Sequence, residues 1–124
     1  MKVACKKRVY IGFMLIALLM ISVGVLAQNN PVEVTIVLTQ DNGENPVTYI
    51  FRTQGNESLF QLMQRKFVIA HTNGFIDSIQ GKASSNEKST AWFYTINGNM
   101  AMVGADAYSY KNGDLINWDL RSWR

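Results

Sequence analysis

Two Asn-Gly pairs near the C-terminus constrain this chain more than any other feature. Asn97-Gly98 follows a run of aromatic and β-branched residues, and Asn112-Gly113 precedes a second apolar run. Asn and Gly both tolerate a positive φ angle, so such a pair between strand-like runs is the strongest local signal for a tight hairpin turn. Residues 90–120 therefore predict strand, turn, strand, turn, strand, which is one half of a small sheet.

Strict alternation predicts the other half of the sheet. Apolar and polar residues alternate from Val32 to Thr39, which is the period of a half-buried strand. A turn over residues 41–44 and a second strand over residues 47–52 complete a β-hairpin, with Pro46 tolerated at the strand entrance. The acidic residues of this turn lack the ligand spacing of an EF-hand, so we interpret it as a turn and not as a calcium site.

One amphipathic helix is predicted between the two halves. Apolar residues recur every three or four positions, so we expect a helix from Ser58 to His71. Asn56 or Ser58 is the expected N-cap. Asn73-Gly74 is expected to supply a left-handed cap after the last turn.

The remaining segments complete a single domain. Residues 75–79 predict a third strand, and residues 81–90 predict a polar loop. A single helix between a hairpin and further strands buries its apolar stripe best against one face of the sheet. We therefore expect an α+β fold that is β-grasp-like, with a mixed sheet of about five strands and one helix packed on one face.

The N-terminus has the layout of a secretory signal peptide. Basic residues precede an uncharged apolar run over residues 11–25, and the −3 and −1 positions before the expected cleavage, Val25 and Ala27, carry small or modest side chains. Cleavage near Ala27 would remove residues 1–27 and leave a secreted or cell-surface domain over residues 28–124. An uncleaved segment is long enough to span a bilayer and would instead anchor the protein in a membrane. Cys5 lies in this segment, so the mature chain has no disulfide.

Charge argues against a nucleic-acid partner. The formal net charge is +3, with 12 basic and 9 acidic residues. Four of the basic residues precede the apolar run: Lys2, Lys6, Lys7 and Arg8. The rest of the chain is therefore close to neutral and has no basic patch.

No residue pattern indicates catalysis or metal binding. His71 is the only histidine, and a position in the last turn of a helix explains it. The chain has no nucleophile motif, no metal-spaced cluster and no glycine-rich phosphate loop. Asp114 follows Gly113 and is interpreted as part of a turn. We expect a protein that is not an enzyme and that requires no cofactor or metal.

Aromatic residues concentrate in the last third of the chain. Alternation places Trp92 and Tyr94 on one face of their strand, and Trp118 shares a face with Ile116. Core packing explains part of this cluster. Because one helix covers only one face of the sheet, aromatic residues on the other face, or on the loop over residues 99–108 beside it, would form an exposed platform for binding.

The same residues carry a resemblance to the transcobalamin-like C-terminal domain, which covers about Val32 to Trp118. The resemblance rests chiefly on this pattern: Trp92-x-Tyr94-x-x-Asn97-Gly98, Gly104, Tyr108, Gly113-Asp114 and Ile116-x-Trp118. That family includes the small C-terminal domain of animal cobalamin carriers and many bacterial secreted or surface proteins. The resemblance implies cobalamin or a related corrinoid as the ligand, with the domain acting as a lid against a helical partner.

Two functions follow from these observations. The first is a secreted, non-catalytic binding module for a corrinoid, acting alone or as a lid on a partner protein. The alternative is a cell-surface module that binds another protein through an exposed sheet edge and has no small-molecule ligand. The predicted ligand contacts are Trp92, Tyr94, Asn97, Gly98, Asn99, Tyr108 and Trp118.

Overall fold

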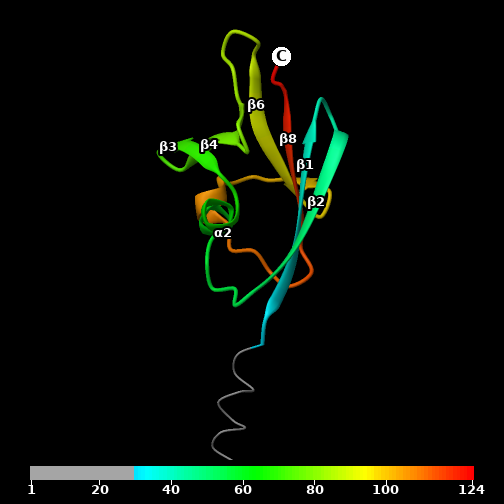
Figure 1. Ribbon diagram of the computed structural model, residues 1–124, viewed down its shortest axis with the longest axis vertical. Helices are drawn as coiled ribbons and strands as arrows, with labels where there is room; N and C mark the ends of the chain where they lie inside the picture. The colour runs from blue at the N-terminus through cyan, green and yellow to red at the C-terminus, as the bar shows by residue number, and fades with distance from the viewer. Residues whose placement is uncertain (1–29) are drawn as a thin grey trace, which may run out of the picture. The chain divides into compact units, whose positions relative to one another are not determined.

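The computed structural model describes residues 30–124, so the predicted signal peptide and its cleavage near Ala27 lie outside the described residues. The alternating N-terminal run forms β1 (Val32–Gln40), which pairs antiparallel with β2 (Glu44–Thr53). Gly43, at φ 103°, closes the turn between them. The predicted hairpin is therefore confirmed (Figure 1).

The main sheet is mixed and has five strands in the order β2-β1-β8-β6-β7. Its centre is a parallel pair of β1 and β8 (Leu115–Ser122), and β6 (Thr90–Ile96) runs antiparallel to β8. The short β7 (Asn99–Met100) follows the turn at Asn97 and Gly98, whose φ angles are 51° and 87°. The α+β prediction of a mixed sheet of about five strands is confirmed, but the strand and hairpin expected before β8 are wrong. Residues 108–110 form no strand, because Ser109 makes only an isolated bridge to Ser58, and β8 pairs with β1 and β6 instead.

The helix begins where the sequence predicts. In α2 (Leu59–Lys66), Ser58 is the N-cap, and its Oγ accepts the Gln61 N–H at 3.1 Å. Gln61 Oε1 in turn accepts the Ser58 N–H at 2.9 Å, which completes a capping box. Leu59, Leu62 and Met63 form the buried face.

The predicted C-terminal half of the helix is wrong. The helix ends at Lys66, and residues up to His71 enter a strand, β3 (Ile69–Thr72), which pairs with β4 (Phe75–Ile79). Two hydrogen bonds fix this pairing at its start, from the Val68 N–H to Gln80 Oε1 at 2.7 Å and from the Gln80 N–H to the Val68 carbonyl at 2.8 Å. Tertiary pairing of the β-branched residues thus overrides an apolar spacing that also fits a helix.

Asn73-Gly74 is consequently a hairpin turn between β3 and β4, not a helix cap. The strand predicted over residues 75–79 exists, but it belongs to a separate sheet in the order β3-β4-β5. In this second sheet β5 (Lys82–Ala83) occupies the start of the predicted polar loop. His71 is an exposed strand residue. Its ring is nearly perpendicular to that of Phe60, and the two ring centroids are 4.8 Å apart.

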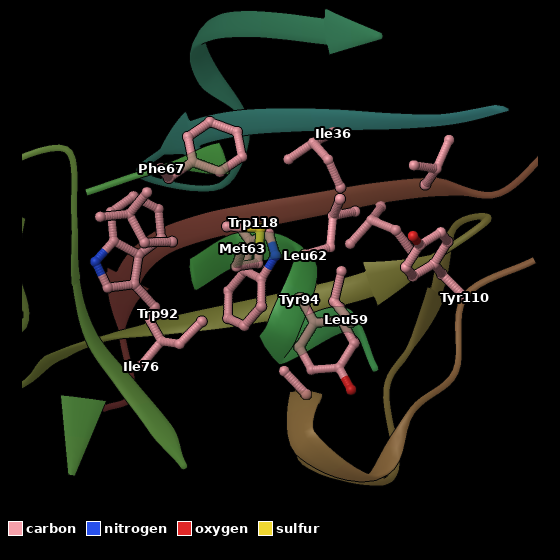
Figure 2. Close-up of a cluster of buried hydrophobic side chains, with 14 residues drawn as sticks. Ile36, Leu59, Leu62, Met63, Phe67, Ile76, Trp92, Tyr94, Tyr110 and Trp118 are labelled. Carbon is pink, nitrogen blue, oxygen red and sulfur yellow. The ribbon is translucent and has the colours of Figure 1, made fainter. Parts of the chain in front are cut away.

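The core lies between α2 and one face of the main sheet (Figure 2). Its fully buried members include Ile36 from β1, Leu62 from α2 and Ile116 from β8. All residues of this core lie within one compact unit, Pro31–Arg124, so the unit has its own core and can be studied without residues 1–27. Within the described residues no helix is long and apolar enough to cross a membrane.

Candidate functional site

An apolar groove of about 420 Å³ runs along β6, between the β3–β4 turn and the segment that joins β7 to the 3-10 helix η1 (Ala105–Ala107). Its floor includes Trp92, Tyr94 and Trp118. Phe75 stands on one wall and Met102 on the other. We call this site the groove.

Hydrogen bonds hold the aromatic floor in place. The Trp92 indole Nε1 donates to the Lys82 carbonyl at 2.9 Å, and the Tyr94 hydroxyl donates to the Val103 carbonyl at 2.7 Å. The Tyr94 and Trp118 rings lie 4.7 Å apart between centroids. Burial, and to a lesser extent the nearby Asp106, raises the pKa of Tyr94, so this hydroxyl stays protonated as a donor. The floor is therefore part of the core and also a fixed surface.

The walls of the groove are apolar and open to solvent. Met102 is 91% exposed and Phe75 is 70% exposed, and Met100 and Val103 extend this surface. Every residue that lines the groove is uncharged. Exposed apolar residues gathered around a hollow are typical of a binding site and are unusual on an inert surface.

One end of the groove depends on two glycines. A Cβ atom at Gly74 would lie 2.8 Å from Asp106 Oδ2, and one at Gly104 would lie 2.9 Å from Asp106 Oδ1. Gly74 also has a φ angle of 86°, which L side chains rarely adopt. The β3–β4 turn and η1 can therefore approach each other closely, which closes this end.

A second group of residues, which includes the predicted contacts Asn97 and Tyr108, surrounds the carboxylate of Asp114. We call it the Asp114 cluster: Asn97, Tyr108, Lys111 and Asp114. Asp114 Oδ2 accepts the Tyr108 hydroxyl at 2.5 Å and the Lys111 N–H at 2.9 Å, while Oδ1 accepts Asn97 Nδ2 at 3.1 Å. Asn97 Oδ1 also accepts the Leu115 N–H at 2.8 Å. These bonds tie both Asn-Gly turns together.

The Asp114 cluster shifts two pKa values. Burial would raise the pKa of Asp114, but the hydrogen bonds from Tyr108, Lys111 and Asn97 together outweigh burial and lower that pKa below its usual 3.8. Burial first, and then the bond to Asp114, raises the pKa of Tyr108 to about 12. Asp114 is therefore a charged acceptor at neutral pH that already accepts three hydrogen bonds. Its own N–H donates to the Lys111 carbonyl at 3.1 Å, which confirms its interpretation as part of a turn.

The seven predicted contacts thus fall into three places. Trp92, Tyr94 and Trp118 lie on the floor of the groove, whereas Asn97 and Tyr108 belong to the Asp114 cluster. The remaining two, Gly98 and Asn99, lie at the exposed β6–β7 turn and do not line the groove.

The wall residues Phe75, Met102 and Val103 are not among the seven predicted contacts, although Met102 and Val103 lie in the loop over residues 99–108 that was expected to take part in binding. The available signal was the segment Met100-Ala101-Met102-Val103, four apolar residues in a loop without periodicity. Runs of apolar residues in a loop are exposed unless another element covers them. That signal marks a wall of the groove.

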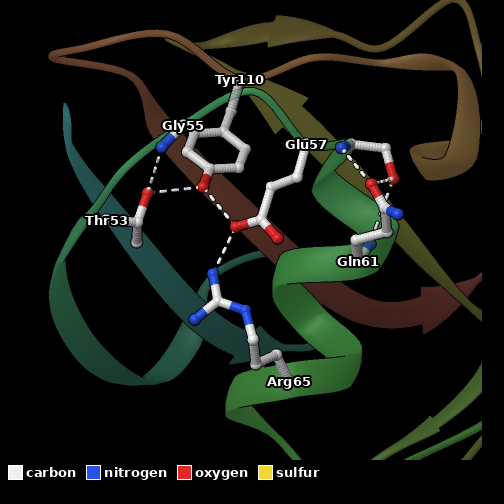
Figure 3. Close-up of polar contacts among 7 residues, drawn as sticks. Thr53, Gly55, Glu57, Gln61, Arg65 and Tyr110 are labelled. Atoms are coloured by element: carbon white, nitrogen blue, oxygen red, sulfur yellow. Dashed lines mark hydrogen bonds and ion pairs between the residues drawn. The ribbon is translucent and has the colours of Figure 1, made fainter. Parts of the chain in front are cut away.

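A polar network at the start of α2 connects the helix to β2 and to the segment before β8 (Figure 3). Glu57 Oε2 accepts the Tyr110 hydroxyl at 2.6 Å and pairs with Arg65. The Tyr110 hydroxyl also lies 2.6 Å from Thr53 Oγ1. Burial and then the Glu57 hydrogen bond raise the pKa of Tyr110. This network joins β2, α2 and the segment before β8, and its groups are mutually satisfied.

A polar hollow on the opposite face of the sheet is also structural. Its central carboxylate, Asp119, accepts Thr39 Oγ1 at 2.8 Å and the N–H groups of Asn42 and Gly43 at 3.1 and 3.2 Å. Asp119 therefore holds the β1–β2 turn in place. Among residues 30–124 no group of His, Cys, Asp and Glu side chains is arranged to hold a metal ion.

This chain belongs to the family DUF4430, described as a domain of unknown function, whose model matches residues 56–122, more than half of the chain. The match spans α2, the small sheet, the groove and the Asp114 cluster. No curated protein sequence matches the chain.

Two solved structures share the fold. A "putative metal binding protein" from Ruminococcus gnavus ATCC 29149 aligns with a TM-score of 0.64 at 15% identity, over 75% of this chain and 99% of that one. Haptocorrin in complex with Cbi aligns with a TM-score of 0.65 at 16% identity, over 77% of this chain. The alignment covers only 26% of haptocorrin, so this chain corresponds to about a quarter of that protein. At these identities the likeness concerns the fold.

Proposed function

We propose that this protein is a secreted, non-catalytic, transcobalamin-like binding module of β-grasp type, and that the groove holds the apolar part of a corrinoid. The observation that carries the proposal is the groove itself, where uncharged, solvent-exposed side chains surround a floor of ordered aromatic rings. Apolar pockets with a few polar anchors are the usual form of small-molecule sites.

The size of the groove limits what it can hold. A volume of about 420 Å³ lies toward the low end of the range for small-molecule sites, about 300–1,000 Å³. A corrinoid is larger than this, so the groove would cover one edge of the macrocycle. Haptocorrin, which was solved with Cbi, has a long additional region beyond the part that aligns with this chain. A partner protein would supply the corresponding contacts here, and the domain would act as a lid.

The groove would bind the macrocycle through its edge and not through the metal. The single histidine of the chain, His71, lies on β3 and does not line the groove. Met102 and Phe75 would instead cover apolar surface of the ligand, at about 25 cal/mol for each Å² removed from water. The flexible thioether of Met102 can adapt to an irregular ligand edge.

Isothermal titration of residues 28–124 with cobalamin tests the proposal. Met102→Ser and Phe75→Ser should each weaken binding by about tenfold, because each removes a large part of one apolar wall. Val68→Ser is the matched control, since Val68 is 75% exposed and lies outside the groove. Absence of heat up to millimolar cobalamin, or equal losses in all three variants, would reject corrinoid binding by the isolated domain.

The alternative function, a protein-binding module at the cell surface, is favoured by a different observation. Strand β2 lies at the edge of the main sheet, and in the described part of the chain no strand pairs with its outer side. Such an edge can accept an added strand. This second function requires no ligand in the groove.

A further inference from the structure

Strand β2 lies at the edge of the main sheet (Figure 1), and the hydrogen bonds of its neighbour β1 show which of its backbone groups point outward. In β1, the Thr35 N–H donates to the Asp114 carbonyl at 3.0 Å, and the Glu33 carbonyl accepts the Gly113 N–H at 2.8 Å. Both residues therefore point their backbone groups toward β8. Because backbone direction alternates along a strand, Val34, Ile36 and Leu38 point theirs toward β2.

The register of the hairpin then identifies the outward residues of β2. Val34, Ile36 and Leu38 lie opposite Phe51, Tyr49 and Val47, so these three point toward β1. The intervening residues, Thr48, Ile50 and Arg52, direct their N–H and C=O groups away from the sheet. Among the described residues no strand lies beyond them.

The usual protection of a sheet edge is weak along this row. Natural edges carry inward-pointing charges, Lys, Pro or bulges that prevent pairing with another chain. In β2 the only proline, Pro46, lies near the start, and the irregular register lies at the turn end of the hairpin. Ile50, at the centre of the row, is 64% exposed. Arg52 is paired with Glu33 at 3.6 Å within the same domain.

We infer that β2 pairs antiparallel with β2 of a second copy of this chain, about a two-fold axis at Ile50. In this register Ile50 faces Ile50, and Thr48 faces Arg52 in both directions. Every outward N–H and C=O group of the row then has a partner. The pairing is isologous, so the same edge serves both copies and the assembly closes as a dimer.

The side chains on both faces fit this register. On the outer face the two Ile50 side chains would meet, and cross-strand apolar pairs contribute to sheet stability. On the inner face, Tyr49 of one copy lies opposite Phe51 of the other. These two rings are only half-buried in the single chain, where both meet the edge of Phe67. Dimerisation would therefore cover apolar surface that the single domain leaves partly exposed.

The neighbouring register is less favourable. A two-fold axis at Thr48 would place Ile50 opposite Pro46, which has no N–H group to donate. With the axis at Ile50, Pro46 lies opposite residue 54, beyond the end of β2 at Thr53. The self-complementary register around Ile50 is the reason why a second copy, and not an unrelated strand, is the inferred partner.

Analytical ultracentrifugation of residues 28–124 over a range of concentrations tests the inference. The unmodified domain should form a dimer, and Ile50→Lys should weaken it by about 100-fold or more, because two ammonium groups would face each other. Met102→Lys is the matched control, at a site that is 91% exposed and follows β7, the strand at the opposite edge of the main sheet, and it should leave the dimer intact. A monomer at all concentrations, or a dimer unaffected by Ile50→Lys, would overturn the inference.

Cross-linking tests the register. Hydrogen-bonded antiparallel pairs place their Cα atoms about 5.5 Å apart, within the range of a disulfide. The domain from residue 28 has no cysteine, so Ile50→Cys should form an intermolecular disulfide on mild oxidation, faster than Met102→Cys at the opposite edge of the sheet. Equal rates would contradict the register. The groove lies toward the other edge of the sheet, so Met102→Ser should not change the assembly, and the dimer can fail or succeed independently of corrinoid binding.

Discussion

The groove and the Asp114 cluster both adjoin strands β6 and β8, but their side chains differ in whether they have partners within the domain. In the Asp114 cluster one carboxylate accepts three hydrogen bonds and so joins two turns. In the groove the side chains at the surface are apolar, and nothing else within residues 30–124 covers them. The contrast shows that one stretch of sequence, residues 92–118, contains residues that stabilise the fold and residues whose apolar side chains are exposed for binding. Substitutions should therefore separate stability from binding.

Leu62→Ala should cause the largest loss of stability. Because it should destabilise the whole domain, it should affect the groove and the Asp114 cluster alike. Leu62 is fully buried in the core shared by the helix and the sheet. Its truncation leaves a cavity, which costs about 2–5 kcal/mol of unfolding free energy. Chemical denaturation measures this loss, with Gln64→Ala on the exposed side of α2 as the control. A loss below about 1 kcal/mol would contradict the docking of the helix on the sheet.

Asp114→Asn should have the next largest effect and should act on stability alone. The amide cannot accept all of the hydrogen bonds that the carboxylate accepts, and unsatisfied buried groups cost about 1–3 kcal/mol. Because the pKa of Asp114 is lowered in the folded protein, its contribution is present above the unfolded pKa of about 3.9 and is lost as the pH falls through the lower folded value. The variant should therefore lose less stability on acidification than the unmodified protein.

The Asp114 cluster also predicts the pH at which stability is lost on the alkaline side. The pKa of Tyr108 is raised to about 12, so its contribution is complete below the unfolded pKa of about 10 and is lost as the pH rises toward about 12. Thermal unfolding between pH 2 and about 12 measures both limits, with Glu87→Gln in the exposed loop as a control for general charge effects. Identical pH profiles for Asp114→Asn and the unmodified protein would show that the cluster does not act through its carboxylate.

Two Asn-Gly pairs show what the sequence can and cannot predict. Asn97-Gly98 was correctly predicted as a hairpin turn, since the aromatic run before it fits a strand and not a helix. Asn73-Gly74 was assigned to a helix end, because apolar residues at helical spacing extend through Phe67 to Ala70. Both pairs do adopt positive φ angles. An Asn-Gly pair thus predicts a reversal, but the element before it depends on pairing with residues that come later in the chain.

For the candidate site, too, the sequence predicted the strands and their faces but not the groove. Alternation correctly placed Trp92 and Tyr94 on one face, but it could not show that this face is the core side and also borders a groove. That groove exists because η1 and the β3–β4 turn meet at Gly74, a contact between segments about thirty residues apart. The wall residues had no periodic signal. Local patterns therefore predict strands and turns, whereas a hollow between loops depends on tertiary contacts.

Met102→Ser should have the smallest effect on stability and should sharpen the contrast with Asp114→Asn. Met102 is 91% exposed, so replacing it removes little buried surface from the folded protein, and the change in unfolding free energy should stay within about 0.5 kcal/mol. Because the same side chain forms a wall of the groove, its loss should weaken cobalamin binding, whereas Asp114→Asn should leave binding unchanged under conditions where the domain is folded. Denaturation gives the unfolding free energy of each variant, and calorimetric titration gives its affinity for cobalamin. If Asp114→Asn weakened binding as much as Met102→Ser, the two regions would be one site, and the Asn97 and Tyr108 side chains would return to the list of ligand contacts.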